Sequence, residues 1–353
     1  MSSPYHIAVF PGDGHSPKVI EAACSVLRAT AKRFAFDVDF TTYPHSGAHH
    51  QATGELLPDE ILAGLPNFHA ILFGGVYHEK AEPGLLYREI LLKITQTLDQ
   101  YISLRPVRLF PGVKSYLRNK GPQQIDYCIV RENSGGINGS IGGTLLPGTP
   151  TETAQETMLY THFQVERCLR FAFELAARPD RRGKLTLTGK SSLLPHVQAL
   201  WTRVFDDLGK EYPQVTRQYY GVDDISMQLV RYPENFDVIV TGNLFGDILA
   251  DIGAVSQGGI GYAGVGSIHP GKTSMFGPMR ASSDFYESSS DQANPMAAIY
   301  AASMLLRHLG EHAAALKLEE AMMVTTATEV IAEGTMLSRF ATEEVANMVA
   351  ARL

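Results

Sequence analysis

The chain has 353 residues, of which 44% are hydrophobic and 19% are charged, so it is long enough for two hydrophobic cores. Its formal net charge of −7 argues against a nucleic-acid-binding protein, because such proteins concentrate Lys and Arg on one face. Three scattered cysteines without CxxC spacing indicate neither a zinc site nor a disulfide framework. We find no signal peptide and no apolar stretch of membrane length, and we therefore expect a cytoplasmic protein without a membrane partner.

The first part of the chain alternates β-branched or aromatic runs with helical periods. Between the first strand and the first helix lies Pro11-Gly12-Asp13-Gly14, a turn of the kind that presents backbone N–H groups to an anion. It is not a GxGxxG motif, and many such turns bind no ligand. The pattern predicts strands over 5–10, 38–43 and 69–75, and helices over 17–34 and 82–102.

Three histidines, His45, His49 and His50, lie in the segment 44–57, for which we predict a loop. A metal site and a solvated polar loop are the two interpretations of this cluster. We favour the polar loop, because no acid or cysteine has the spacing of a further metal ligand.

The middle of the chain contains a glycine-rich segment, 134–151, with six glycines and two prolines. It is too long and too glycine-rich for a simple turn, and it predicts an extended arm that leans on a second subunit. Around it the sequence predicts an extended segment over 103–110, a strand over 125–130 and an amphipathic helix over 152–177.

The rest of the chain continues to alternate strands with helices, which is typical of an α/β fold with a largely parallel sheet. The sequence predicts strands over 184–188, 218–222 and 237–241, helices ending near 208, following 223 and starting at 244, a Gly/Ser-rich loop over 258–278, a helix over 294–309 and two helices within 316–353.

Two acids follow the predicted strand 237–241. Asp247 and Asp251 are four residues apart, so their carboxylates share one face of a helix. Like charges in this position repel each other unless a cation lies between them, and carboxylate oxygens suit Mg²⁺ or Mn²⁺. A solvated helix face is the alternative, but Leu244 and Phe245 belong to a helix that is mostly apolar.

Further charged residues collect where predicted strands end. They are Arg105, Arg131, Lys190 and Asp223. Since the carboxyl ends of parallel strands form the ligand-facing edge of a sheet, this set favours a site for a metal and a small polyanion.

Five motifs occur in one order along the chain: PGDG, DQYISLRPVRLFPG, VREN, ERCLRFAFELA and NLFGDILAD. In these motifs the chain resembles the β-decarboxylating hydroxyacid dehydrogenases, the family of isopropylmalate, isocitrate, homoisocitrate and tartrate/D-malate dehydrogenases. The resemblance runs from residue 6 to about residue 310, and DQYISLRPVRLFPG leans towards the tartrate/D-malate branch.

The resemblance implies a two-domain fold without the usual dinucleotide motif. The large domain would comprise 1–100 and 255–353 and carry the cofactor loops, and the small domain would comprise 101–254 with the substrate and metal residues and the arm at 134–151. It also implies a homodimer whose two active sites lie in the interdomain clefts and are shared by the subunits. The substrate would be a small anionic hydroxy acid.

The resemblance also implies roles for single residues. Asp247 and Asp251 of one subunit and Asp223 of the other would hold Mg²⁺ or Mn²⁺. Lys190, also from the partner, would accept the proton of the substrate hydroxyl. Asn138 would be a catalytic residue together with Lys190 and Asp223. The positions implied for substrate binding are Thr95, Arg105 and Arg131.

For the nicotinamide cofactor the resemblance favours NAD, which the tartrate-like branch uses. NADP is the alternative, because the Arg280 guanidinium could pair with a 2′-phosphate. The positions implied for cofactor binding are Asp13, His15, Gly75, Arg280, Asp284 and Asn294.

Four departures from the family pattern alter this expectation. Thr95 stands where the family has an arginine, and Asn138 where it has a tyrosine that donates a proton. Arg280, in GPMRASSDFY, replaces a histidine of the cofactor loop, and EGTMLSRFATEE replaces a loop that holds adenine. We expect oxidation of a 2-hydroxy acid whose distal group is smaller or neutral, with little or no β-decarboxylation. The alternative is that Arg108 or Tyr101 takes over the two lost roles.

A function of a different class stays open at this point. A degenerate homologue could bind a metabolite or a partner without turnover, and the departures favour it. Retention of Lys190 and three aspartates argues against it, because an acid cluster destabilises a protein when no metal is bound.

Overall fold

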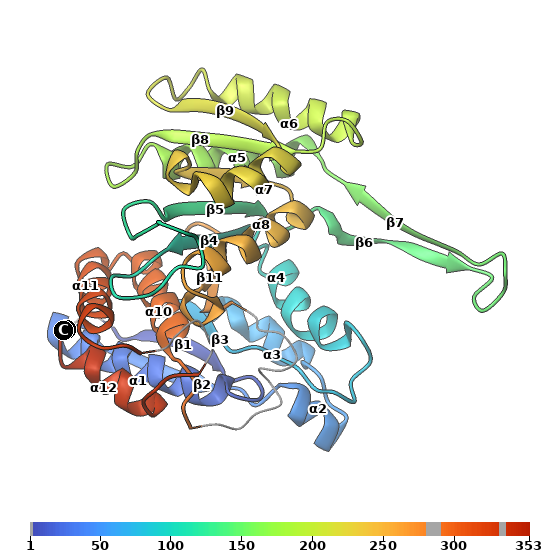
Figure 1. Ribbon diagram of the computed structural model, residues 1–353. Coiled ribbons are helices and arrows are strands. Elements are labelled where there is room, and N and C mark those ends of the chain that lie inside the picture. Colours follow the sequence, from blue (N-terminus) through green and yellow to red (C-terminus); the bar gives the residue numbers. More distant parts are fainter. Residues whose placement is uncertain (1–2, 280–290, 332–336) are drawn as a thin grey trace. The chain divides into compact units, whose positions relative to one another are not determined.

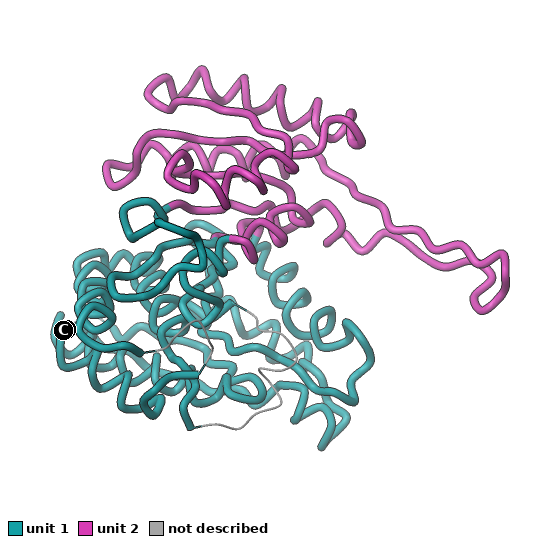
Figure 2. Tube along the Cα trace, in the orientation of Figure 1, with its two compact units in different colours: residues 1–100, 105–126, 253–353 teal, residues 101–104, 127–252 magenta. Residues whose placement is uncertain are grey.

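The computed structural model describes residues 3–279, 291–331 and 337–353. The chain divides into two compact units (Figure 2). Unit 1 comprises Met1–Gln100, Arg105–Asp126 and Gly253–Leu353, and unit 2 comprises Tyr101–Leu104 and Tyr127–Ile252. None of the described helices is long and apolar enough to span a membrane.

The strands of unit 1 follow the order β2-β1-β3-β12-β11. All neighbouring pairs are parallel except β11 and β12, which are antiparallel. Their bounds are β1 (Tyr5–Phe10), β2 (Val38–Thr42), β3 (Ala70–Phe73), β11 (Gly264–Ile268) and β12 (Ser274–Pro278). β3 is buried along its whole length, which explains its continuous apolar run.

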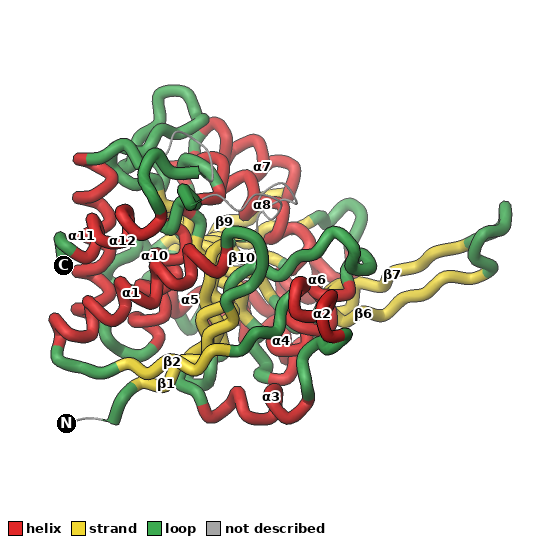
Figure 3. The backbone as a smooth tube through the Cα atoms, turned by 90° about the horizontal axis from the view of Figure 1, so that it is seen from below, coloured by secondary structure: helices red, strands yellow, loops and turns green. Residues whose placement is uncertain are grey.

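Helices cover both faces of these strands (Figure 3). On one face α10 contacts β12, β11, α1 and α11, and α12 packs on α1 and α11. Residues 296–306 of α10 are all buried, as expected for a helix that is apolar all round. The bounds are α1 (Ser16–Phe34), α10 (Met296–His308), α11 (His312–Thr328) and α12 (Thr342–Ala350).

On the other face, one buried cluster joins the strands to helices that follow β2 in the chain. Ala8 and Phe10 of β1 and Ile71 and Phe73 of β3 contribute to it, two residues apart on each strand and therefore on one side of the sheet. The helices on this side are α3 (Asp59–Gly64), η1 (Leu65–Asn67), the π-helical η2 (Tyr87–Leu92) and α4 (Lys93–Thr97).

Three sequence-based predictions in unit 1 are wrong. The predicted loop 44–57 contains the helix α2 (Gly47–Thr53), and the predicted loop 258–278 contains η4 (Ile260–Tyr262) and the hairpin β11–β12. The predicted helix 82–102 is shorter, from Tyr87 to Thr97, because Asp99 adopts a positive φ of 47° and ends it.

Four strands of unit 2 pair in parallel, in the order β5-β10-β8-β9. α5 packs on β10, β8 and α6, and α7 packs on β9 and β8 (Figure 1). The strand bounds are β5 (Asp126–Glu132), β8 (Lys184–Gly189), β9 (Thr216–Gly221) and β10 (Val238–Thr241). The helices are α5 (His162–Ala176), α6 (Pro195–Leu208), α7 (Val222–Arg231), η3 (Pro233–Asn235) and α8 (Asn243–Ser256).

An antiparallel hairpin extends from unit 2 (Figure 1). It consists of β6 (Gly136–Leu145) and β7 (Thr153–Leu159). The predicted arm is therefore longer than 134–151, and the helix predicted to start at 152 starts only after Thr161, whose hydroxyl forms a capping box with Gln164. Ile141, Leu145 and Leu146 on the hairpin are exposed.

The strand β4 (Ile102–Arg108) contributes residues to both units. The resemblance implies that 101–254 form the small domain, whereas in the structure 105–126 belong to unit 1. The reason is packing: the ring of Phe110 contacts Tyr262 and Tyr300, and the Arg108 guanidinium pairs with the buried Glu319.

Candidate functional site

The predicted acid pair lies on α8, directly after β10. Every residue of β10 is buried, and Asn243 at the start of α8 is buried as well. Asp247 and Asp251 are exposed one turn apart on the same face of the helix. The fold thus directs both carboxylates outwards from a rigid strand–helix junction.

Arg131, at the end of β5, reaches the first of these acids. Thr241 and Arg131 are paired in the parallel register of β10 and β5, which brings the end of β5 beside the start of α8. Arg131 donates from Nη1 to Asp247 Oδ1 at 2.5 Å and from Nη2 to Asn133 Oδ1 at 3.1 Å. A Cβ on Gly246 would lie 2.8 Å from Arg131 Cγ, so glycine leaves the room that this side chain occupies.

Lys190 and Asp223 form a second cation–carboxylate pair, from Lys190 Nζ to Asp223 Oδ2. The register of β8 and β9 pairs Gly189 with Gly221, so the residues that follow the two strands meet at one edge. The Asp223 side chain is 66% exposed, and its carboxylate is therefore accessible to further ligands.

These pairs correct one expectation. The sequence shows no basic residue near the three aspartates and predicts that they repel one another without a metal. In the structure Asp247 lies against Arg131 and Asp223 lies against Lys190. Residues distant in sequence supply the counter-charges, because parallel strand ends come together only in the folded sheet.

The three aspartates do not converge within one chain. Among the described residues, only His45, His49 and Glu55 form a group of three or more metal-ligating side chains whose ligand atoms lie within 4.8 Å of one another. Asp223 on α7 and the Asp247/Asp251 pair on α8 are separate features of one chain.

Asn138, predicted as catalytic, lies at the base of the hairpin. Its Nδ2 donates to the Asn133 carbonyl oxygen at 3.2 Å. Asn133 in turn accepts from Arg131, so the three side chains form one connected polar network in unit 2.

Sequence reasoning missed Glu132, which is fully buried next to this network. Its carboxylate accepts hydrogen bonds from the N–H groups of Ser134 and Gly135, both at 2.8 Å, and from the Ser134 hydroxyl. Burial raises the pKa of Glu132, and these hydrogen bonds oppose the rise. VREN could have revealed it, since a buried strand that ends in two charged residues needs partners for both.

Sequence reasoning also missed Tyr160 and Asn243, which fix the hairpin to α8. The Asn243 N–H donates to Tyr160 Oη at 3.2 Å, and Asn243 Nδ2 donates to the Gly135 carbonyl oxygen. Burial raises the pKa of the Tyr160 hydroxyl, which therefore stays protonated at neutral pH. Tyr160 also packs edge to face on Trp201.

Tyr160, Lys190 and Trp201 line a small pocket of about 20 Å³ in unit 2, together with Thr241 and Gly242. A larger hollow of about 780 Å³ lies over α6 and β9 and includes Phe205, Arg217 and Tyr219. None of the predicted site residues lines the larger hollow. The small pocket is therefore the one related to the predicted chemistry.

The other two predicted substrate residues belong to unit 1. Thr95 on α4 is buried, and its hydroxyl donates to the Leu92 carbonyl oxygen at 2.9 Å within the same helical segment. Arg105 is half-buried on β4. The Thr95 hydroxyl, at the position where the family has an arginine, is thus hydrogen-bonded to the backbone of its own helical segment.

The predicted cofactor loops after β1 and β3 pack backbone against backbone. A Cβ on Gly12, at φ +81°, would lie 2.3 Å from the Gly75 carbonyl oxygen, and one on Gly74 would lie 2.0 Å from that of Pro11. Asp13 donates its N–H to the Gly75 carbonyl oxygen at 2.8 Å. Only glycine permits this approach, which explains both glycine clusters.

The Asp13 carboxylate is buried and accepts hydrogen bonds from backbone N–H groups of Gly47, Ala48 and Tyr77 at 2.7, 2.8 and 2.9 Å. It therefore holds the loops of unit 1 together. His15, the residue before α1, is also buried.

Asn294 is buried in front of α10 and accepts the Met296 N–H at 3.1 Å. Its Nδ2 has no hydrogen-bond partner among the described residues, so it is an available donor. Arg280 and Asp284 lie outside the described residues.

The chain is similar to proteins of one known family. A family model described as isocitrate/isopropylmalate dehydrogenase matches residues 6–349. The chain is 41% identical over 319 residues to the 3-isopropylmalate dehydrogenase of Thermobifida fusca (strain YX), covering 90% of this chain and 89% of that one. It is 39% identical over 357 residues to the 3-isopropylmalate dehydrogenase of Leifsonia xyli subsp. xyli (strain CTCB07), covering 99% of both.

A solved structure is similar as well. The crystal structure of isocitrate dehydrogenase from Methylococcus capsulatus matches with a TM-score of 0.88 and 29% sequence identity, covering 99% of both chains. The named relatives are 3-isopropylmalate and isocitrate dehydrogenases, whereas the motif DQYISLRPVRLFPG leans towards the tartrate/D-malate branch.

Proposed function

The chain belongs to the isocitrate/isopropylmalate dehydrogenase family and is an NAD(P)-dependent hydroxyacid dehydrogenase acting on a CH–OH group, and from this premise we propose that it oxidises a 2-hydroxy acid with a malate backbone in a metal-dependent reaction. The observation that carries the proposal is the pairing of cations with carboxylates at the strand ends of unit 2: Arg131 with Asp247 after β5 and β10, and Lys190 with Asp223 after β8 and β9.

The donor set fits a hard divalent cation. Asp247 and Asp251 expose two carboxylates on one helix face, and Asp223 exposes a third, all of which offer oxygen ligands of the kind that Mg²⁺ and Mn²⁺ prefer. When bound, such an ion would polarise the substrate hydroxyl oxygen. Asp247, Asp251 and Asp223 are the residues that would hold it.

Arg131 and Lys190 supply the remaining chemistry. Arg131 now donates to a carboxylate of the protein, and it can exchange that partner for a substrate carboxylate in the same charge-assisted geometry. Lys190 Nζ would accept the proton of the substrate hydroxyl, and a bound nicotinamide would supply the acceptor of the hydride. Since Asn243 and Tyr160 hold the adjacent hairpin base, this edge of unit 2 is preorganised.

The proposed sites are shared between two copies of the chain. The three aspartates do not gather within one chain, and the hairpin exposes Ile141, Leu145 and Leu146, which a second copy would cover. In such a dimer Lys190 and Asp223 of one subunit would complete the site that contains Asp247 and Asp251 of the other.

The substrate is expected to carry a distal group that is smaller or neutral. Thr95 contributes no charge, and its hydroxyl is already bonded to Leu92. The two residues considered as replacements are engaged elsewhere, because Arg108 pairs with Glu319 and the Tyr101 ring lies 4.1 Å under the Arg167 guanidinium. The Asn138 amide can donate a hydrogen bond to an enolate but is not acidic enough to protonate it, so β-decarboxylation is expected to be slow or absent.

The test is a substrate panel with the purified enzyme. 3-Isopropylmalate comes first because the named relatives are 3-isopropylmalate dehydrogenases, followed by isocitrate, D-malate and tartrate. Each is assayed with NAD and with NADP, in Mn²⁺ and in excess chelator. We expect NAD reduction in Mn²⁺ and none in chelator. The opposing idea, a homologue that binds without turnover, predicts cofactor binding but no reduction with any acid.

A further inference from the structure

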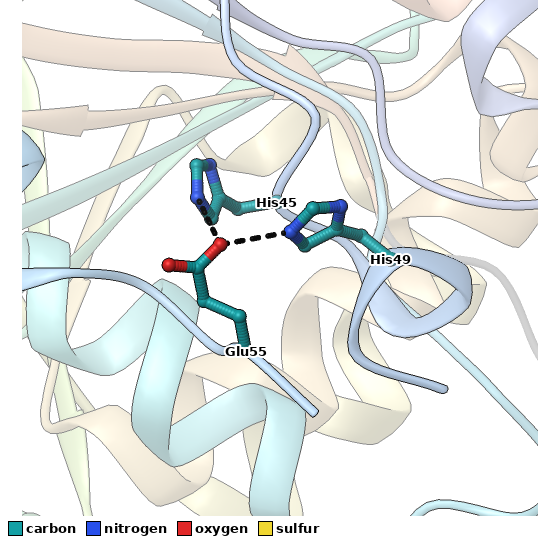
Figure 4. Close-up of side chains that lie close together, drawn as sticks. All are labelled: His45, His49 and Glu55. Carbon is teal, nitrogen blue, oxygen red and sulfur yellow. Dashed lines mark hydrogen bonds and ion pairs between the residues drawn. The ribbon is translucent and has the colours of Figure 1, made fainter. Parts of the chain in front are cut away.

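A second group of ligating side chains lies in unit 1, around the short helix α2. His45, His49 and Glu55 point towards one another there (Figure 4). The sequence favours a solvated loop for this segment because no acid has ligand spacing. The premise of that interpretation is wrong, since Glu55 folds back after α2 and lies against both imidazoles.

The start of α2 fixes the two histidines. The buried Asp13 carboxylate accepts the N–H groups of Gly47 and Ala48, and the Ser46 hydroxyl accepts the His49 N–H at 3.3 Å. These bonds tie the first turn to the loop after β1. His45, just before the helix, and His49, in its first turn, therefore belong to a segment that is anchored by a buried charge.

The turn at the end of α2 brings Glu55 close to His45 and His49. Gly54 adopts φ +77° and donates its N–H to the His50 carbonyl oxygen, so the chain reverses direction there. The Thr53 hydroxyl donates to the His49 carbonyl oxygen at 2.9 Å and accepts the Glu55 N–H at 3.1 Å. Backbone contacts thus place Glu55 beside the two rings.

The distances from the Glu55 carboxylate to the two imidazoles are close to those between ligands of one small ion, and the ligand atoms of all three residues lie within 4.8 Å of one another. Glu55 Oε2 lies 3.1 Å from His49 Nε2 and 3.6 Å from His45 Nε2. Ligands bound tetrahedrally to zinc at its usual bond lengths are separated by about 3.3 to 3.5 Å. A hydrogen bond accounts for the His49 contact, but 3.6 Å is too long for the second one.

One side of the cluster is buried and the other is open to solvent. The His45 side chain is only 5% exposed, whereas Glu55 is 53% exposed, so an ion can reach the cluster from solvent.

We infer that His45 Nε2, His49 Nε2 and Glu55 Oε2 form a zinc site, with water as the fourth ligand. Two imidazoles and one carboxylate favour zinc over the hard cations that the all-oxygen donors of unit 2 suit. The ion joins the beginning of α2 to the segment that follows it. It would stabilise this part of unit 1 and takes no part in the proposed oxidation.

The test is calorimetric titration of the full-length protein with Zn²⁺, in excess Mg²⁺ to occupy the carboxylates of unit 2. One zinc per chain is expected. Glu55→Gln and His49→Gln should each weaken binding about 100-fold or more, since each removes one of three ligands. His50→Gln is the matched control, because His50 is adjacent in sequence but not part of the cluster, and it should bind like the wild type.

Two further measurements separate this site from the proposed active site. Asp247→Asn should still bind one zinc, and X-ray absorption of that zinc should show two imidazole ligands. Circular dichroism checks that each variant is folded. No zinc binding by the wild type, or equal binding by wild type, His49→Gln and Glu55→Gln, would show that the cluster is only a hydrogen-bonded pair with a neighbouring histidine.

Discussion

Arg131 and Asp247 are joined by a 2.5 Å contact between Nη1 and Oδ1, which connects the end of β5 to α8. The same carboxylate is a proposed metal ligand, and the same guanidinium a proposed substrate ligand. In the structure Asp247 therefore binds Arg131 instead of the proposed ion, and Arg131 binds Asp247 instead of the proposed substrate. Removing the carboxylate should affect metal binding more than folding, because Asp247 is 56% exposed.

We predict that Asp247→Asn abolishes activity and removes the stabilisation by Mn²⁺. An ion at 100 times its Kd, bound only to the folded state, raises the free energy of unfolding by about 2.7 kcal/mol. Thermal unfolding with and without Mn²⁺ measures this difference. Asp224→Asn, which changes an exposed acid next to Asp223, should keep the full Mn²⁺ shift. An unchanged shift in Asp247→Asn would remove this residue from the metal site.

Shared active sites predict complementation. Lys190→Ala and Asp247→Asn chains, mixed after dissociation and reassociation, should regain part of the wild-type activity. In a mixed dimer one site collects both defects and the other collects neither. If mixed dimers demonstrably form and no activity returns, each chain carries its own complete site.

The base of the hairpin should not tolerate a side chain at Gly136. This residue has φ +61°, and a Cβ there would lie 2.4 Å from both Tyr160 Oη and Asn243 Oδ1. Gly136→Ala should lower the free energy of unfolding by about 1 to 3 kcal/mol. Gly143→Ala is the control, because a Cβ there meets nothing within 4 Å. Denaturant unfolding of both variants measures the difference, and equal stabilities would contradict the packing argument.

Thr95 and Asn138 are expected to decide whether the substrate loses its second carboxylate as CO₂. We predict much less than one CO₂ per reduced nicotinamide, because neither residue supplies the charge or proton that the family positions carry. Headspace CO₂ measured against nicotinamide absorbance gives the ratio. Stoichiometric CO₂ with D-malate or tartrate as a good substrate would show that other groups supply both functions.

Much of the sheet could be predicted from the sequence, because strands such as β3 and β10 are short apolar runs that are buried completely. The predicted helices α1 and α10 are confirmed. α1 buries one face and α10 is buried on nearly all sides, so both show the apolar pattern of a packed helix. The α/β class is also confirmed.

What the sequence could not predict depends on tertiary contacts. α2 has no apolar period and is held by the carboxylate of Asp13, and β7 is a strand because it pairs with β6. The partners of Asp247 and Asp223 lie far away in the chain. The acid of the histidine cluster was missed because its approach depends on the left-handed conformation of Gly54.

The most direct test of the central claim is the initial rate of nicotinamide reduction in Mn²⁺ with the best substrate of the panel, compared between wild type and Lys190→Met. Methionine keeps most of the unbranched side chain and removes the group that would accept the proton. The proposed role predicts a rate at least about 100-fold lower with Mn²⁺ binding retained, as for loss of a general base. A variant that reduces NAD at the wild-type rate would contradict the assignment of Lys190, and with it the active site proposed on unit 2.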